Sequence, residues 1–242
     1  MRVPWPANFP LLRGHTSYPV LRRHRRYEAA KTRADAEEAV NLCYEVADEQ
    51  LMLCLDGEFC GRNPPPLIVA PSVAPEETNN ALARTYAAWL ADQLDGELAT
   101  DIIQVNTAVK RDFITERYAR LVQEPEFEGP VVAGRDYILA DDVCTSGGTL
   151  ASLRGFIENN GGRVIFMTSL ATGGGADVQV SLAPATRDEV YGAYDGGLAE
   201  LVLEELGYEA ECLTEAEARY LLDRASLEAI RKGVASAKAA GA

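Results

Sequence analysis

Short apolar segments alternate with helical patterns through the middle of the chain, and this order limits the fold more than any other feature. The apolar segments are residues 67–70 (LIVA), 101–106 (DIIQVN), 136–140 (DYILA) and 163–170 (RVIFMTSL). Helical patterns occupy residues 81–94 and about 149–160, and Gly161-Gly162 supplies a stop signal for the second helix. Strands that alternate with helices predict an α/β fold, in which helices cover both faces of a parallel sheet. Ligands of such sheets bind beyond the carboxyl ends of the strands.

The two ends of the chain differ from this pattern. Residues 1–26 are rich in Pro and Arg without a clear period, so we expect an irregular arm, whereas residues 27–53 read as a helix. The strand signal fades after about residue 181, and residues 214–217 (TEAE) have the sequence of a capping box. The predicted organisation is a basic arm and helix at 1–54, an α/β core at 55–180, and a helical extension at 181–242 that covers the site as a hood or packs on the sheet edge.

The composition is that of a soluble globular protein. The 242 residues are 47% apolar and 25% charged. No apolar run approaches the roughly 20 residues that span a membrane, and the first residues lack the features of a signal peptide. The five cysteines are odd in number and irregularly spaced, which is typical of reduced thiols. We therefore expect a cytoplasmic protein without a membrane contact.

The net charge of −14 is unevenly distributed. Residues 1–33 hold eight Lys/Arg and one acid, a balance of +7, so the remainder stands at −21. An acidic body argues against a broad nucleic-acid footprint. The basic residues 22–26 (RRHRR) either touch a phosphate backbone, remain solvated, or contact the protein's own acidic surface, and the last two readings are favoured.

The segment Tyr137–Leu150, YILADDVCTSGGTL, joins an apolar strand to a helix through two acids and a small polar loop. Backbone N–H groups and the helix dipole make the start of that helix an anion-binding point. Hydroxyls of the loop add donors, and Gly147-Gly148 let the backbone approach a ligand closely. The loop lacks the Gly-Lys-Ser/Thr ending of the nucleotide P-loop.

Asp141 and Asp142 need a different role, because carboxylates in contact with a phosphate would repel it. They are expected to accept hydrogen bonds from vicinal hydroxyls, or to hold Mg²⁺ directly or through water. A sugar phosphate with free hydroxyls satisfies both halves of the motif.

The run Leu139–Thr149 (LADDVCTSGGT) resembles the signature of the type I phosphoribosyltransferases, which bind phosphoribosyl pyrophosphate (PRPP). The resemblance implies a Rossmann-like parallel sheet, Asp141 and Asp142 at the ribose hydroxyls and at Mg²⁺, and the 5-phosphate on residues 145–149. The implied PRPP contacts are Asp141, Asp142, Val143, Cys144, Thr145, Ser146, Gly147, Gly148, Thr149 and Asn79. Residues 66–175 and 213–222 also resemble a group of bacterial, often plasmid-borne, phosphoribosyltransferase-like proteins.

Two positions depart from the family pattern. The loop 75–80 should offer donors to pyrophosphate, yet it contains Glu76-Glu77, which either hold Mg²⁺ or favour the start of the next helix. Thr145 stands where purine-specific members carry an acid, so a purine acceptor handled through that acid is not expected.

The segment 107–124 carries Lys110, Arg111, Arg117 and Arg120. The family's chemistry implies a basic loop that closes over the pyrophosphate, with Lys110 and Arg111 acting in catalysis beside the two aspartates. The alternative is a solvated amphipathic helix.

These features predict Mg²⁺-dependent transfer of a 5-phosphoribosyl group from PRPP to a nucleobase-like nitrogen acceptor, with release of pyrophosphate. The alternative is a non-catalytic regulator that binds PRPP or a nucleotide, which the acidic loop and the basic arm favour. A PRPP-making pyrophosphokinase fits less well, because the chain shows no second nucleotide-binding segment. The predicted partners are PRPP and a small-molecule acceptor, and a homodimer is the common assembly of such cores.

Overall fold

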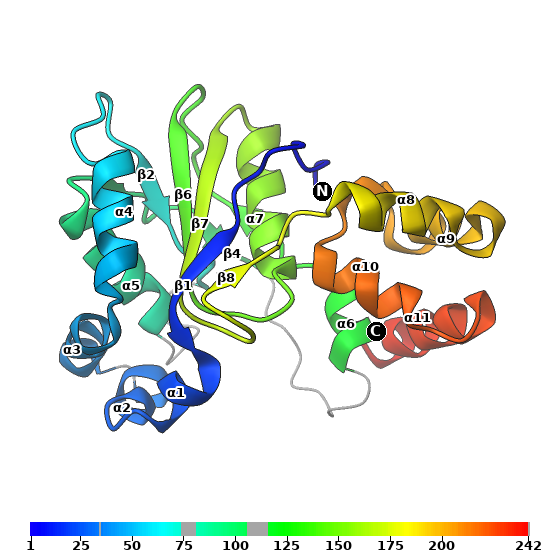
Figure 1. Cartoon of the computed structure of the whole chain (residues 1–242), viewed down its shortest axis with the longest axis horizontal. Helices are drawn as coiled ribbons and strands as arrows, with labels where there is room; N and C mark the ends of the chain where they lie inside the picture. Colours follow the sequence, from blue (N-terminus) through cyan, green and yellow to red (C-terminus); the bar gives the residue numbers. More distant parts are fainter. Residues whose placement is uncertain (34, 74–80, 106–115, 242) are drawn as a thin grey trace.

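The computed structural model describes residues 1–33, 35–73, 81–105 and 116–241. Within these ranges a six-stranded sheet has the order β3-β2-β6-β7-β1-β8 (Figure 1). Its strands are β1 (Leu12–Ser17), β2 (Leu67–Val69), β3 (Glu97–Leu98), β6 (Asp136–Cys144), β7 (Arg163–Thr172) and β8 (Asp177–Val178). All neighbouring strands are parallel except β1 and β8. The predicted α/β fold with a mostly parallel sheet is confirmed.

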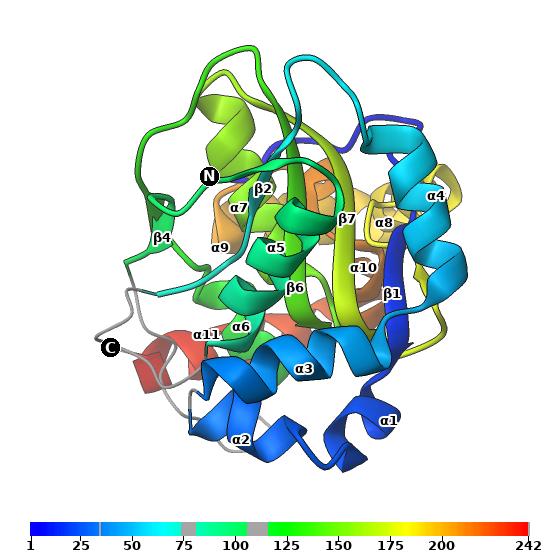
Figure 2. The same cartoon turned by 90° about the vertical axis from the view of Figure 1, so that its left-hand side faces the viewer.

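Helices cover both faces of this sheet (Figures 1 and 2). One face carries α3 (Ala36–Val46), α4 (Glu49–Phe59) and α5 (Leu82–Gln93), and the other carries α7 (Gly148–Asn159). The side chains of β6 alternate between the two layers. Ile138 and Ala140 belong to the core with α3, α4 and α5, whereas Tyr137 and Leu139 belong to the core with α7. Burial on both faces explains why this strand is a continuous apolar run in the sequence.

The C-terminal part is helical, as predicted, and has its own apolar cluster. Its elements are α8 (Pro184–Gly192), η2 (Ala193–Gly196), α9 (Gly197–Leu206), η3 (Ala210–Cys212), α10 (Glu215–Leu222) and α11 (Leu227–Gly241). The capping box that begins α10 is confirmed, with Thr214 and Glu217 each accepting from the other's backbone N–H. Within the described ranges, no helix combines the length and the apolar character that a membrane crossing requires.

A helix from the middle of the chain joins this C-terminal group. Helix α6 (Glu116–Val122) lies beside α10 and α11 (Figure 1), and Leu121 belongs to their apolar cluster. The contact is close, since a Cβ on Gly233 of α11 would lie 2.3 Å from the ring of Tyr118. The C-terminal group therefore includes residues that the sequence placed within the core range. The predicted boundaries at residues 54 and 180 stay predictions.

The prediction of an irregular arm at 1–26 is wrong for residues 12–23. Strand β1 lies inside the main sheet between β7 and β8, and α1 (Tyr18–Arg23) follows it. The segment LRGHTS has few apolar residues, and its glycine fits a close contact with β7, since a Cβ on Gly14 would lie 2.5 Å from Cγ2 of Thr172. Arg25 and Arg26 contact the protein's own acids, with nitrogen–oxygen distances of 2.9 Å and 2.8 Å to Glu45.

Residues 27–53 form several helices in place of the single predicted one. They are α2 (Tyr27–Thr32), α3 and the first part of α4. Asp35 and Asp48 separate them, because each side chain accepts a backbone N–H at the start of the next helix.

The prediction of a main-sheet strand at 101–106 is also wrong in the described part. Strand β4 (Ile103–Gln104) pairs antiparallel with β5 (Phe127–Glu128) in a separate two-stranded sheet. In contrast, β6 continues four residues beyond the predicted end at 140, because Asp141 pairs with Ser169 and Val143 with Ala171 of β7.

Candidate ligand-binding site

The polar motif lies where β6 ends and α7 begins. The strand runs through both aspartates, a short loop follows Cys144, and α7 begins at Gly148. Gly147 has φ of 77°, and a Cβ there would lie 2.5 Å from Cγ1 of Val180. Glycine is thus required both for the left-handed backbone and for the packing of the loop. The loop and the first residues of α7 line the space beyond the carboxyl end of β6.

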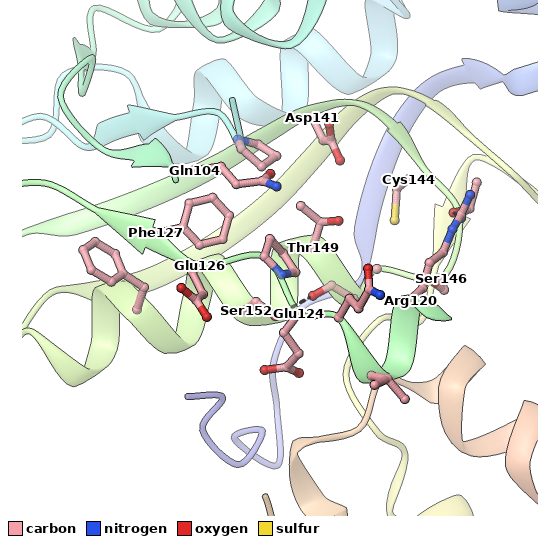
Figure 3. Close-up of a pocket in the computed structure, with 18 of the residues that line it drawn as sticks. Gln104, Arg120, Glu124, Glu126, Phe127, Asp141, Cys144, Ser146, Thr149 and Ser152 are labelled. Carbon is pink, nitrogen blue, oxygen red and sulfur yellow. Dashed lines mark hydrogen bonds between the residues drawn. The ribbon is translucent and has the colours of Figure 1, made fainter. Parts of the chain in front are cut away.

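A cleft of about 1030 Å³ opens at this edge. Figure 3 shows Asp141, Thr149, Glu124 and Glu126 around it. The predicted residues that line it together are Asp141, Asp142, Val143, Cys144, Thr145, Ser146, Gly147, Gly148 and Thr149. Asn79, Lys110 and Arg111 lie outside the described residues, so their predicted roles stay predictions.

The two aspartates have different surroundings. Asp142 is 6% exposed, and its carboxylate forms an ion pair with Lys31 of α2. Asp141 lines the cleft, and its Oδ1 accepts from the backbone N–H of Asp142 at 2.8 Å. Burial and the neighbouring Asp142 raise the pKa of Asp141 well above its ordinary value, and Lys31 opposes this shift. A protonated Asp141 both donates and accepts hydrogen bonds, which suits a ligand hydroxyl.

The cleft holds more carboxylates than cations. Glu124 and Glu126 face it together with the two aspartates, and Arg120 of α6 is the arginine in its lining. The guanidinium of Arg120 donates to Oγ1 of Thr145 at 3.2 Å, so the C-terminal group contacts the loop directly. Arginine at this position suits a ligand that combines hydroxyls with anionic oxygens.

The described residues include no group of three or more His, Cys, Asp or Glu side chains placed to hold a metal ion. Mg²⁺ usually binds through one or two carboxylates, several waters and the phosphates of a ligand. Asp141 and Asp142 fit that mode, in which a phosphorylated ligand supplies much of the coordination.

Cys144 is a packing residue. Its side chain is 2% exposed and belongs to the core between the sheet and α7. Burial raises the pKa of the thiol to about 12, so the thiolate is scarce at neutral pH and the residue is not a nucleophile.

A buried ion pair supports the start of α7. Arg2 and Glu217 are 3% and 5% exposed, and Nη1 of Arg2 lies 2.5 Å from Oε2 of Glu217. Nε of Arg2 also lies 2.5 Å from Glu124. A Cβ on Gly148 would lie 2.5 Å from Oε1 of Glu217, so glycine at the first helical position makes room for the pair. The pair ties residue 2 and α10 to the loop.

A second hollow of about 870 Å³ adjoins the cleft and shares Asp142, Val143, Thr145, Ser146 and Arg120 with it. Its other walls come from α1, α2, α6 and α10, with the side chains of Arg22, Lys31, Arg117, Tyr18, Tyr27 and Tyr220. The sequence marked Arg22 only as part of the basic segment 22–26, and it did not point to Lys31 or the tyrosines. Lys31 meets Asp142 across 111 positions, and no local pattern marks such a contact.

No protein-family model matches the sequence. Protein TraN of Escherichia coli is 33% identical over 238 residues, which cover 98% of this chain and 51% of TraN. An uncharacterized protein of Haemophilus influenzae is 31% identical over 164 residues, which cover 65% of this chain and 34% of that protein. The chain thus spans about half of the first relative and a third of the second.

Solved structures of phosphoribosyltransferases show a weak likeness. A hypoxanthine phosphoribosyltransferase from Staphylococcus aureus has a TM-score of 0.35 and 14% identity over 57% of this chain and 72% of that chain. An adenine phosphoribosyltransferase from Thermoanaerobacter pseudethanolicus has a TM-score of 0.34 and 16% identity over 57% of this chain and 82% of that chain.

Proposed function

We propose that this chain transfers a 5-phosphoribosyl group from PRPP to a nitrogen atom of a small-molecule acceptor. The observation that carries the proposal is that two adjacent acids, a loop of Thr, Ser and Gly, and the start of α7 line one cleft. Hydroxyls at Asp141 and Asp142 and a phosphate at residues 145–149 are the complementary groups of a phosphorylated sugar. The resemblance of Leu139–Thr149 to the PRPP-binding signature supports the same ligand.

The loop would act on the 5-phosphate, which takes no part in the chemistry. Backbone N–H groups at the start of α7, with the hydroxyls of Thr145, Ser146 and Thr149, would hold this group. Binding energy gained there fixes the sugar in place and is available to the reaction at the other end of the ring.

The acids would act at the ribose. In the transfer, the acceptor nitrogen forms a bond to C1 of the ribose while the bond from C1 to pyrophosphate oxygen breaks. The electron pair of that bond leaves with pyrophosphate, and where the acceptor nitrogen carries a proton, that proton passes to pyrophosphate or to water. Positive charge develops on the ribose ring, and an ionised carboxylate of the Asp141–Asp142 pair would stabilise that charge. Both side chains would also position the ribose hydroxyls.

Negative charge develops on the leaving pyrophosphate. Mg²⁺, held by Asp141 or Asp142 together with the ligand's phosphates, would neutralise part of it when bound. Arg120 of α6 already contacts the loop, and Lys110 and Arg111 are proposed to add charge from the segment that precedes α6.

The proposal is tested by measuring the thermal unfolding temperature of the protein with PRPP and Mg²⁺. Ribose 5-phosphate, AMP and pyrophosphate, each added alone, serve as comparison ligands. A ligand at a hundred times its dissociation constant stabilises a protein by roughly 2.7 kcal/mol, which is readily measured. We expect a shift with PRPP that the Asp141→Asn/Asp142→Asn variant loses while its circular dichroism is unchanged. Asp188→Asn on α8 is the control, because Asp188 lies on an exposed helix face outside the cleft. A folded double variant that keeps the full shift would overturn the assignment.

The second candidate is a regulator that binds PRPP or a nucleotide without turning it over. The Lys31–Asp142 ion pair favours it, because one of the two acids is already engaged by the protein's own cation. Measurement of pyrophosphate release with a set of nitrogen acceptors separates the two functions. PRPP binding without release for any acceptor would support the regulator.

A further inference from the structure

The hollow beside the cleft, here called the basic hollow, differs from the cleft in charge. Arg22, Lys31, Arg117 and Arg120 line it, against two carboxylates, Asp142 and Glu217. The chain as a whole carries a net charge of −14. A concave positive surface on an acidic body attracts an anionic ligand and holds it more strongly than a flat surface would.

Both carboxylates of the basic hollow already have cationic partners. Asp142 pairs with Lys31, and Glu217 pairs with the buried Arg2 outside the hollow. In the part of the chain that the structure describes, neither Arg22 nor Arg117 has a carboxylate partner. Two guanidinium groups in the lining, one from α1 and one from α6, therefore remain available to an anion. Arginine suits carboxylate and phosphate equally, since it binds both through paired N–H groups.

Tyrosine rings supply the other walls. Tyr18, Tyr27 and Tyr220 line the hollow, and the guanidinium of Arg117 lies 5.3 Å from the ring centroid of Tyr220. Burial raises the pKa of Tyr27, with further contributions from Tyr18 and Asp142, so its phenol is protonated and can donate. Aromatic walls favour a planar ring over a flexible chain, because stacked rings bury apolar area at low entropic cost.

The basic hollow also has a defined position. It shares Asp142, Thr145 and Ser146 with the cleft, so its occupant lies beside the sugar site and within reach of it. We propose that the basic hollow binds the acceptor, and that this acceptor is a planar nitrogen heterocycle carrying a carboxylate or a phosphate. This inference rests on the proposed function, and it names the substrate class. A neutral ring would leave Arg22 and Arg117 without a counter-ion.

Matched ligand pairs that differ in charge test the inference. The pairs are uracil 6-carboxylate with uracil, nicotinate with nicotinamide, and 3-pyridylmethyl phosphate with 3-pyridylmethanol, titrated calorimetrically with and without PRPP and Mg²⁺. The first two pairs examine a carboxylate and the third a phosphate. We expect the anionic member of at least one pair to bind about tenfold more tightly than its neutral partner.

Variants locate the effect. Arg22→Gln/Arg117→Gln should remove the advantage of the anion, whereas Arg23→Gln should keep it, because Arg23 is the next residue of α1 and does not line the hollow. Equal affinities within every pair, no saturable binding of either member, or an advantage that survives the double variant would overturn the inference.

The change in unfolding temperature caused by PRPP shows whether the acceptor assignment alone is wrong or the proposed function as well. A PRPP shift that depends on Asp141 and Asp142, without any preference for anionic rings, would overturn the acceptor assignment alone. Binding of an anionic ring without any PRPP shift would overturn the proposed function, and the acceptor role with it.

Discussion

Lys31 of α2 forms an ion pair with Asp142 of β6, across 111 positions of the sequence. The pair brings the N-terminal segment against the second acid of the motif, which lines both the cleft and the basic hollow. Its partners are unequally buried, because the Lys31 side chain is 27% exposed and the Asp142 side chain 8%. Removal of the lysine charge should therefore destabilise mainly the ionised form of Asp142, which has little access to water.

Lys31→Met is expected to destabilise the fold by about 1–3 kcal/mol, less than the loss of a fully buried pair because Lys31 is partly solvated. Two adjacent carboxylates then stand without the nearest cation, and Asp142 has little access to water. Guanidinium unfolding measures the change through the midpoint at constant slope. Lys31→Arg, which keeps the charge, should lose less. An unchanged unfolding free energy for Lys31→Met would show that water already compensates Asp142.

Gly147→Ala should destabilise the loop more than Gly134→Ala. The two glycines have nearly equal φ values, 77° and 76°, so alanine meets the same backbone strain of about 1 kcal/mol at both. Only at Gly147 would the new Cβ collide, with Cγ1 of Val180 at 2.5 Å, whereas nothing lies within 4 Å of a Cβ at Gly134.

Crowding should add about 1–3 kcal/mol at Gly147. Unfolding free energies of the two variants give the difference directly. The double variant Gly147→Ala/Val180→Ala should recover part of it, because the colliding methyl group is gone. Equal losses at the two glycines would mean that Val180 moves aside without cost.

Arg2→Met should destabilise the protein by about 3–5 kcal/mol, because it leaves Glu217 buried without its cation. Arg163→Met is the matched control, because Arg163 forms an ion pair with Asp136 while its side chain is 70% exposed. Loss of this pair should lower the unfolding free energy by less than about 1 kcal/mol. A double-mutant cycle with Glu217→Gln measures the coupling. Additive losses in that cycle would show that the two side chains act independently.

Stability should fall as the pH drops from about 6.5 to about 4, because of His15. Its Nδ1 accepts from the backbone N–H of Asp48 at 3.0 Å, so Nε2 carries the proton and donates to the Tyr86 hydroxyl at 3.0 Å. A second proton on this ring has no acceptor at Nδ1. Burial lowers the pKa of His15 to about 4, against a small opposing effect of Asp48.

The unfolded chain therefore binds a proton at His15 at a higher pH than the folded chain does. Above about pH 6.5 the site makes no pH-dependent contribution, and the loss reaches about 3 kcal/mol near pH 4. Urea unfolding at a series of pH values measures the slope, and His15→Gln should flatten it in this range. A wild-type slope that His15→Gln leaves unchanged would assign the effect to other groups.

Local patterns were enough to predict the central part of the fold. The strands at 67–70 and 163–170, the helix at 81–94 and the capping box at 214–217 each depend on neighbouring residues, and the structure contains all four. The clustering of residues 141–149 on one cleft also follows from one local unit, a strand, a loop and a helix.

The remaining features depend on contacts between distant segments. Strand β1 has too few apolar residues to be recognised, and it exists because β7 and β8 offer it partners. Helix α6 joins the C-terminal group through Tyr118 and Leu121, which a single helical pattern cannot reveal. The basic hollow draws its walls from four helices, so its charge becomes visible only when the chain is folded.

The place of β1 between β7 and β8 also has a consequence during synthesis on the ribosome. Arg13 pairs with Thr168, and the Thr168 hydroxyl donates to the Arg13 carbonyl across 155 positions. At ~5–20 residues per second, the N-terminal strand must wait roughly 8–30 s before its partner strand is made. The sheet is therefore expected to close only after β7 has been synthesised, and until then the emerging chain exposes the unpaired edge of β1.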